Sequence, residues 1–280
     1  MIKTARQLKD LVRNKTMGDS LKSQVILRNY IMERFLERLS NSEFRNHFVL
    51  KGGMLISAIV GIDNRSTMDI DATIKNLPLN IDSAKDIVEK IISVPLEDNV
   101  SFSIKSMHEI MEESEYGGIR MNLESKFDTM LIPIKIDIST GDVITPREIE
   151  YHFRLMFENR DISILAYNME TVLAEKLESI LSKSITNTRM RDFYDIYILT
   201  TYHSHLYDEQ ALSDAFGATC KKRNSTSAME QRNDTVATIK NSKIMIDLWN
   251  KYQKKYSYAE DITWDMAIHT IENTVALLKR

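Results

Sequence analysis

Three aspartates in the first half of the chain have the type and spacing that suit chemistry on phosphates. Asp69 and Asp71 lie two apart in residues 68–74, which alternate in polarity and predict a strand. Side chains two apart on a strand share a face, so we expect these carboxylates to converge. Asp137 lies in a second alternating segment, 132–138, whose four isoleucines face the other way. Converging carboxylates repel, and oxygen ligands favour a hard cation such as Mg²⁺.

A glycine pair precedes the aspartates, directly after a short apolar run that predicts a strand. Gly52 and Gly53 follow Phe48-Val49-Leu50 and Lys51. Backbone N–H groups at such a turn can approach phosphates closely. Taken alone, Asp-x-Asp suits the solvated face of a strand, and Gly-Gly suits an ordinary turn. Their order, followed by a lone aspartate in an isoleucine-rich strand, predicts the two-metal site of a nucleotidyltransferase.

The elements that must position these residues form a mixed half followed by a helical half. Thr4 and Gln7 fit a capping box, and apolar residues keep helical spacing over 19–39. Asn168 can cap a later helix that carries an apolar stripe. Further helices are expected over 83–92, 191–202, 244–252 and 266–278, short strands over 100–105 and 118–123, and a mobile basic loop over 217–234.

These patterns predict an α/β (α+β) protein with two lobes. Residues 1–160 would hold the N-terminal helices and a small mixed-sheet core, and residues 161–280 a helical domain. The fractions of apolar and charged residues, 43% and 28%, are those of an ordinary globular protein. The scarcity of glycine (8) and proline (4) argues for helices rather than a turn-rich sandwich.

Composition also limits the partners that we expect. Cys220 is the single cysteine, so it can form neither an internal disulfide nor a cysteine-based zinc site. Residues 1–15 carry charges throughout, unlike a signal peptide, and no apolar stretch suits a membrane span, so we expect a cytoplasmic protein. The net charge of −3 gives no global indication of nucleic-acid binding, so any basic surface must be local.

Two signatures resemble those of the AbiEii-type nucleotidyltransferase toxins, which belong to abortive-infection toxin–antitoxin systems and to the polymerase-β-like superfamily. The first signature is Lys51-Gly52-Gly53 with Arg65-x-Thr67-x-Asp69-Ile70-Asp71; the second is Ala174-Glu175-Lys176-Leu177 with Arg191-Asp192-Phe193-Tyr194-Asp195. The resemblance spans roughly residues 45–200. One difference is that the superfamily commonly has Gly-Ser at the turn where this chain has Gly-Gly, which removes a hydroxyl that could contact a phosphate.

The resemblance implies a role for each matching residue. Asp69 and Asp71 would hold one or two Mg²⁺ ions and the triphosphate of an NTP, and Asp137 would share a metal and favour deprotonation of the attacking hydroxyl. Lys176 would reach the triphosphate, and Asp192 would orient that lysine or the acceptor. The implied nucleotide-binding residues are Lys51, Gly52, Gly53, Arg65 and Thr67.

The resemblance also implies the partners. Several family members add nucleotides to the 3′ acceptor end of tRNA, which blocks aminoacylation and arrests growth until a cognate antitoxin neutralises the toxin. We therefore expect transfer of a nucleoside monophosphate from an NTP to an RNA acceptor, the tRNA 3′ end. Two alternatives stay open: an antibiotic-type transferase acting on a small molecule, and a non-catalytic nucleotide- or RNA-binding regulator.

Several of these residues also have plainer explanations. Lys176 borders the apolar stripe of its helix and could simply extend from the core to solvent. Phe193, Tyr194 and Tyr197 suit packing between helices better than stacking on bases. The basic run 221–223 suits a solvated loop, although it could meet RNA phosphates.

Overall fold

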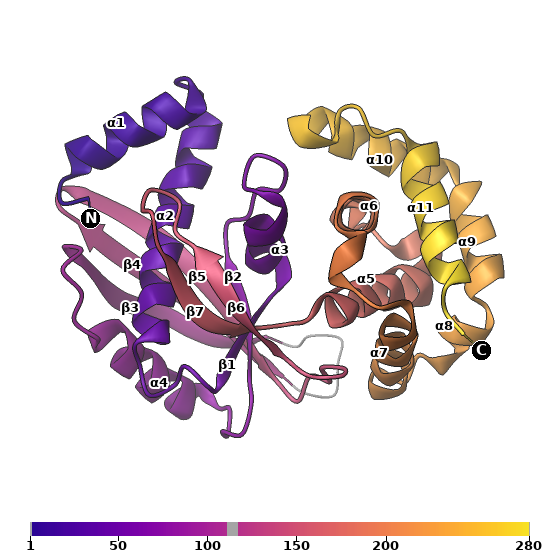
Figure 1. Cartoon of the computed structure of the whole chain (residues 1–280), viewed down its shortest axis with the longest axis horizontal. Helices are drawn as coiled ribbons and strands as arrows, with labels where there is room; N and C mark the ends of the chain where they lie inside the picture. The colour runs from indigo at the N-terminus through magenta and orange to yellow at the C-terminus, as the bar shows by residue number, and fades with distance from the viewer. Residues whose placement is uncertain (1, 111–116, 280) are drawn as a thin grey trace. The chain divides into compact units, whose positions relative to one another are not determined.

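The computed structural model describes residues 2–110 and 117–279 and divides them into two compact units. The first unit holds the chain up to Asp142 together with Ile149–Ala166, and the second holds Val143–Glu148 and the chain from Tyr167 onward. Sheet and helices make up the first unit, whereas the second is helical (Figure 1). The expected mixed α/β fold class is therefore confirmed.

A mixed sheet of seven strands forms the centre of the first unit, in the order β3-β4-β5-β2-β1-β7-β6. The strands are β1 (Phe48–Lys51), β2 (Ile70–Ile74), β3 (Val100–Ile110), β4 (Gly118–Phe127), β5 (Met130–Thr140), β6 (Ile149–Arg154) and β7 (Asp161–Ala166). The pairs β2–β5 and β1–β7 are parallel, and the other neighbours are antiparallel. Strands β6 and β7, which are short and lie at one end of the sheet, were not predicted from the sequence.

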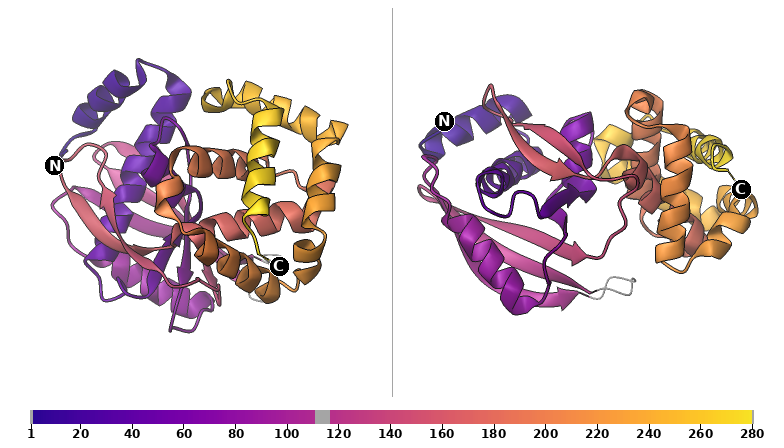
Figure 2. Two further views of the ribbon diagram at one scale, coloured as in Figure 1. Left: turned by 45° about the vertical axis from the view of Figure 1, so that its right-hand side comes forward. Right: turned by 60° about the horizontal axis from the view of Figure 1, so that its bottom comes forward.

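In the described part of the first unit, four helices accompany the sheet. They are α1 (Ala5–Thr16), α2 (Ser20–Ser40), α3 (Gly52–Val60) and α4 (Ile81–Ser93). The capping box of Thr4 and Gln7 is present at the start of α1. Helix α2 contacts β5 and β7 of the sheet and also packs against α4, which contacts β3 (Figure 2).

Helix α2 confirms the helix expected over 19–39, and its second half is buried on all sides. Every residue from Asn29 to Leu39 is buried, including four charged side chains. Arg38 donates from Nη1 and Nη2 to the two oxygens of Asp98, at 2.7 and 2.8 Å, and from Nη2 to the Val100 carbonyl at 2.6 Å. These partners replace solvent around the charged groups, which allows the helix to lie in the interior.

A second part of this buried network connects α2 to the segment before β7. Arg34 forms ion pairs with Glu37 at 2.8 Å and with Glu158 at 2.9 Å. Both carboxylate oxygens of Glu33 accept from the Met156 N–H at 3.1 Å. Burial raises the pKa of Glu33 from its ordinary 4.5 to about 8, against the opposing effects of the Met156 bond and the Arg34 charge.

The second unit is built from helices. They are α5 (Met169–Lys183), α6 (Met190–Tyr202), α7 (Glu209–Lys222), α8 (Thr226–Glu230), α9 (Arg232–Lys240), α10 (Lys243–Lys255) and α11 (Trp264–Ala276), with single 3₁₀ turns at Ser184–Thr186, Ser204–Leu206 and Ser257–Ala259. Asn168 caps α5 as expected, by accepting from the Thr171 N–H. Among the described residues, no helix has the length and apolar character needed to cross a membrane.

The expectation of a mobile loop over 217–234 is wrong. The segment contains the end of α7, all of α8 and the start of α9. Phe216 and Cys220 are buried on one side of α7. The polar residues of this segment therefore lie on the exposed side of a helix and do not form a loop. Arg223 of the basic run forms ion pairs with Glu175 and Glu178, at 3.0 and 2.7 Å.

Replacing Asp98 by alanine should lower the free energy of unfolding by about 3–5 kcal/mol, because Arg38 would keep its charge in the interior without its carboxylate. Urea unfolding followed by circular dichroism measures the change. The control is Asp10→Ala, which removes the exposed ion pair with Arg13 and should change stability little. Equal effects of the two substitutions would contradict this account of the buried pair.

Glu33 should make the stability of the protein depend on pH. Its pKa is about 8 in the folded state and near 4.5 when unfolded, so its stabilising contribution is complete below pH 4.5 and is lost as pH rises through 8. Glu33→Gln removes this titration, so the variant should gain stability relative to the natural protein between pH 5 and pH 9. Urea unfolding at several pH values tests this, and parallel pH profiles would disprove it.

Candidate active site

Strand register brings two of the three aspartates together. Strand β2 pairs in parallel with β5 so that Asp71 lies opposite Asp137. On the other side of β2, Lys51 of β1 lies opposite Asp71, and on the other side of β5, Arg120 of β4 lies opposite Asp137. Four charged residues therefore form a row across adjacent strands. Asp69, expected within the strand, directly precedes β2.

The three carboxylates lie close enough to affect one another. Burial is the largest cause that raises the pKa of Asp71 from 3.8 to about 6, and the charges of Asp69 and Asp137 raise it further. Lys51 and the Gly53 N–H, which donates to Asp71 Oδ2 at 3.4 Å, partly oppose this increase. The charges of Asp69 and Asp137 therefore add to the negative potential at Asp71.

Two cations that were not assigned to the site from the sequence pair with these carboxylates. Lys135 Nζ lies 2.6 Å from Asp69 Oδ2 and 3.7 Å from Asp137 Oδ2. Arg120 donates to both oxygens of Asp137, at 2.8 and 2.7 Å, and these bonds raise its own pKa. The alternation of residues 132–138 already indicated that Lys135 and Asp137 share one face of the strand. Arg120 could be found only from the pairing of β4 with β5.

The glycine pair is required by close packing against the site. Gly52 has a φ of +66°, and a Cβ there would overlap Asp71 Oδ2 and lie 2.8 Å from Asp71 Cβ. A Cβ on Gly53 would lie 2.7 Å from Thr67 Oγ1. Helix α3 begins at Gly52, so its first backbone N–H groups follow the turn directly. Free N–H groups at a helix start favour anions such as phosphate.

The remaining residues of the first signature hold these elements in place. Arg65 and Thr67 are buried, with 2% and 1% of their surface exposed, so they lie beneath the turn. The Arg65 guanidinium donates to the Ser66 carbonyl at 2.6 Å, and Asn29 of α2 donates to the Thr67 carbonyl at 2.9 Å. Lys51 Nζ forms an ion pair with Asp142 Oδ2 at 2.6 Å.

The second signature lies within the second unit, where Lys176 of α5 meets α6. Lys176 Nζ lies 2.8 Å from Asp192 Oδ1 and 2.7 Å from Asp195 Oδ2. Asp195 is fully buried, whereas Lys176 and Asp192 keep part of their surface exposed. Lys176 thus joins two helices by charge rather than simply extending to solvent. Phe193, Tyr194 and Tyr197 are buried, which agrees with the packing role favoured from the sequence.

The three carboxylates have the donor chemistry of a site for a hard divalent cation. Asp69, Asp71 and Asp137 supply only oxygen, and the charges of Asp69 and Asp137 add to the effect of burial on the pKa of Asp71, a repulsion that a cation would relieve. In the described part of the chain, no three or more histidine, cysteine, aspartate or glutamate side chains are already arranged as metal ligands. Metal binding would therefore require the ion pairs with Lys135 and Arg120 to rearrange.

Comparison with known proteins identifies the family. A family profile described as "Nucleotidyl transferase AbiEii toxin, Type IV TA system" matches residues 34–270. This chain belongs to the AbiEii nucleotidyltransferase toxin family. The match covers most of the chain and confirms the resemblance inferred from the two signatures. The chain is thus a nucleotidyltransferase of a family of toxin–antitoxin toxins.

Solved structures show the same fold at low sequence identity. The nucleotidyltransferase toxin MenT4 from Mycobacterium tuberculosis has a TM-score of 0.57 with this AbiEii chain, at 16% identity over 97% of this chain and 99% of that one. JHP933 from Helicobacter pylori has a TM-score of 0.53 at 13% identity, over 91% of both chains. No curated protein sequence matches the chain significantly.

Replacing Gly52 by alanine should reduce both stability and nucleotide binding, because the new methyl group displaces Asp71. The matched control is Gly18→Ala. Gly18 also has a positive φ, +82°, but a Cβ added there would have no atom within 4 Å. Both variants should lose about 1–2 kcal/mol through backbone strain, and Gly52→Ala should lose more. Urea unfolding and NTP titration measure the two effects; equal losses would show that Asp71 tolerates the methyl group.

Proposed function

We propose that this AbiEii toxin uses Mg²⁺ to transfer a nucleoside monophosphate from an NTP to the 3′ end of tRNA in the cytoplasm. The observation that carries the proposal is the β2–β5 register, which sets Asp71 opposite Asp137 with Asp69 beside them. The tRNA acceptor follows from the family resemblance. Transfer would block aminoacylation and arrest growth, and a cognate antitoxin would neutralise the toxin, as expected for defence against phage.

The chain's own groups suit this reaction. The backbone N–H groups after Gly52 would bind the β- and γ-phosphates. A role for Lys176 in binding the triphosphate rests on the family resemblance alone. Asp69, Asp71 and Asp137 would hold one or two Mg²⁺ ions, which supply charge that neutralises the phosphates and lower the pKa of a bound hydroxyl.

The transfer is an in-line displacement at the α-phosphorus of the NTP. A ribose hydroxyl oxygen of the acceptor forms the new bond to phosphorus, and the bond to the pyrophosphate oxygen breaks. The hydroxyl proton passes to a carboxylate of the site, for which Asp137 is the candidate. Positioning and charge account for most of the rate increase in such reactions.

Asp71→Asn should abolish transfer while leaving the protein folded. We expect label from one of four α-³²P-labelled NTPs to enter purified tRNA with Mg²⁺, and a decrease of about 10²-fold or more in the variant. Asp86→Asn, an exposed position on α4, is the matched control and should retain activity. Chelation by EDTA should stop transfer, and added Mg²⁺ should restore it.

The same variant also tests the charge at the site. Because the pKa of Asp71 is raised to about 6, its stabilising contribution is lost as pH rises through 6, so Asp71→Asn should be more stable than the natural protein at pH 8.

Full transfer activity in this variant would refute the assignment. Labelling of an aminoglycoside but not of tRNA would instead identify a small-molecule transferase.

A further inference from the structure

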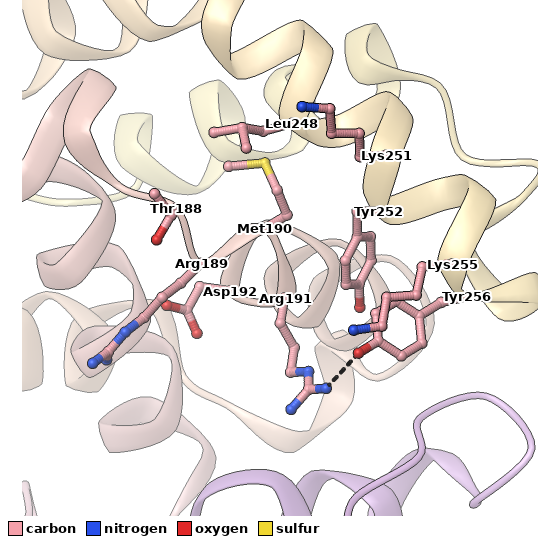
Figure 3. Close-up of a pocket in the computed structure, with 10 residues that line it drawn as sticks. All are labelled: Thr188, Arg189, Met190, Arg191, Asp192, Leu248, Lys251, Tyr252, Lys255 and Tyr256. Carbon is pink, nitrogen blue, oxygen red and sulfur yellow. Dashed lines mark hydrogen bonds between the residues drawn. The ribbon is translucent and has the colours of Figure 1, made fainter.

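A hollow of about 490 Å³ lies within the second unit, between the start of α6 and the C-terminal half of α10. Its walls include Arg189 and Arg191, from the start of α6, and Lys251, Lys255 and Tyr256, from α10 and the residue that follows it (Figure 3). The volume is in the range of sites that bind small molecules or single groups of larger ligands. The sequence patterns indicated no role for the residues of α10.

The hollow concentrates positive charge on a chain whose net charge is −3. Four of its ten lining residues are cationic, and Asp192, its one acidic residue, is paired with Lys176. Lys251 and Lys255 are exposed and stand four residues apart, on one face of α10. Within the described ranges, no carboxylate forms an ion pair with either lysine or with Arg189, so their charge is available to an anionic ligand.

An aromatic ring lies among these cations. Arg191 donates to the hydroxyl of Tyr256 at 3.1 Å, as Figure 3 shows, and Lys255 Nζ lies 5.3 Å from the ring centroid. Burial acts to raise the pKa of Tyr256, but the charges of Arg191 and Lys255 outweigh it and lower that pKa below its ordinary value. Met190 and Leu248 add apolar surface to the same hollow.

We propose that this hollow binds a single-stranded segment of the RNA acceptor, an inference that rests on the proposed function and deepens it. Lys251, Lys255 and Arg189 would contact phosphates of the strand. A base would stack on Tyr256 in place of Tyr258 or Lys255, which now lie against its ring. Exposed cations with an aromatic platform are the combination that binds single-stranded nucleic acid without reading its sequence. The cations of the hollow come from two separate elements, which suits an extended strand better than a free NTP, whose triphosphate is assigned to the glycine turn.

Fluorescence anisotropy tests whether the two lysines bind RNA. The ligand is a fluorescein-labelled, unstructured 12-nucleotide RNA, and its affinity is measured at several salt concentrations. Lys251→Gln/Lys255→Gln should weaken binding about tenfold and reduce the salt slope by about 1.4, since each contact to single-stranded RNA contributes about 0.7. The control, Lys243→Gln/Lys254→Gln, makes the same charge change at exposed positions of α10 outside the hollow and should have little effect.

Substitutions of Tyr256 test the stacking. Tyr256→Leu should weaken RNA binding about tenfold, because an alkyl side chain offers no ring to a base. Tyr256→Phe keeps the ring and loses only the hydroxyl that bonds Arg191, so it should bind RNA nearly as well as the natural protein. Equal losses in the two variants would overturn the stacking role.

Kinetics separate this inference from the proposed function. With the Lys251→Gln/Lys255→Gln protein, the KM for tRNA should rise about tenfold while the KM for NTP stays unchanged. Three results would each overturn the inference. They are equal effects of the two lysine pairs, a rise in the KM for NTP alone, and tighter binding of polyglutamate than of RNA. If the natural protein binds RNA through these lysines but transfers no label, the inference stands and the proposed function fails.

Discussion

The parallel hydrogen bonding between β2 and β5 fixes the candidate active site. It sets Asp71 opposite Asp137, and the flanking pairings then add Lys51 and Arg120 to the same row. A slip of one residue in this pairing would turn the side chains of one strand to the other face of the sheet and separate the carboxylates. The buried isoleucines of β5 oppose such a slip, because it would expose them to water.

The same aspartates would be unfavourable neighbours without compensation. Lys135 and Arg120 neutralise part of their charge, whereas burial and the remaining negative charge together raise the pKa of Asp71. Such a cluster of like charges costs folding stability, and strongly perturbed pKa values of this kind gather at functional sites. The unusual burial of charged side chains in α2 serves a different purpose, since Arg38 and Asp98 satisfy each other inside the core.

Local patterns predicted the strands that carry Asp71 and Asp137, the caps at Thr4 and Asn168, and the helical character of the second half. They did not predict Arg120 at the site, because its place depends on pairing between segments that are distant in sequence. Lys176 could not be matched with Asp195 for the same reason. The error over 217–234 arose from its polar residues, which hide the buried side of α7 around Phe216.

The space around Gly53 has a consequence for the evolution of this family. A side chain at this position would meet Thr67 Oγ1, so a serine there needs a smaller or differently oriented residue at position 67. The two positions should therefore change together among homologues, with Gly-Gly accompanying threonine and Gly-Ser accompanying an altered partner.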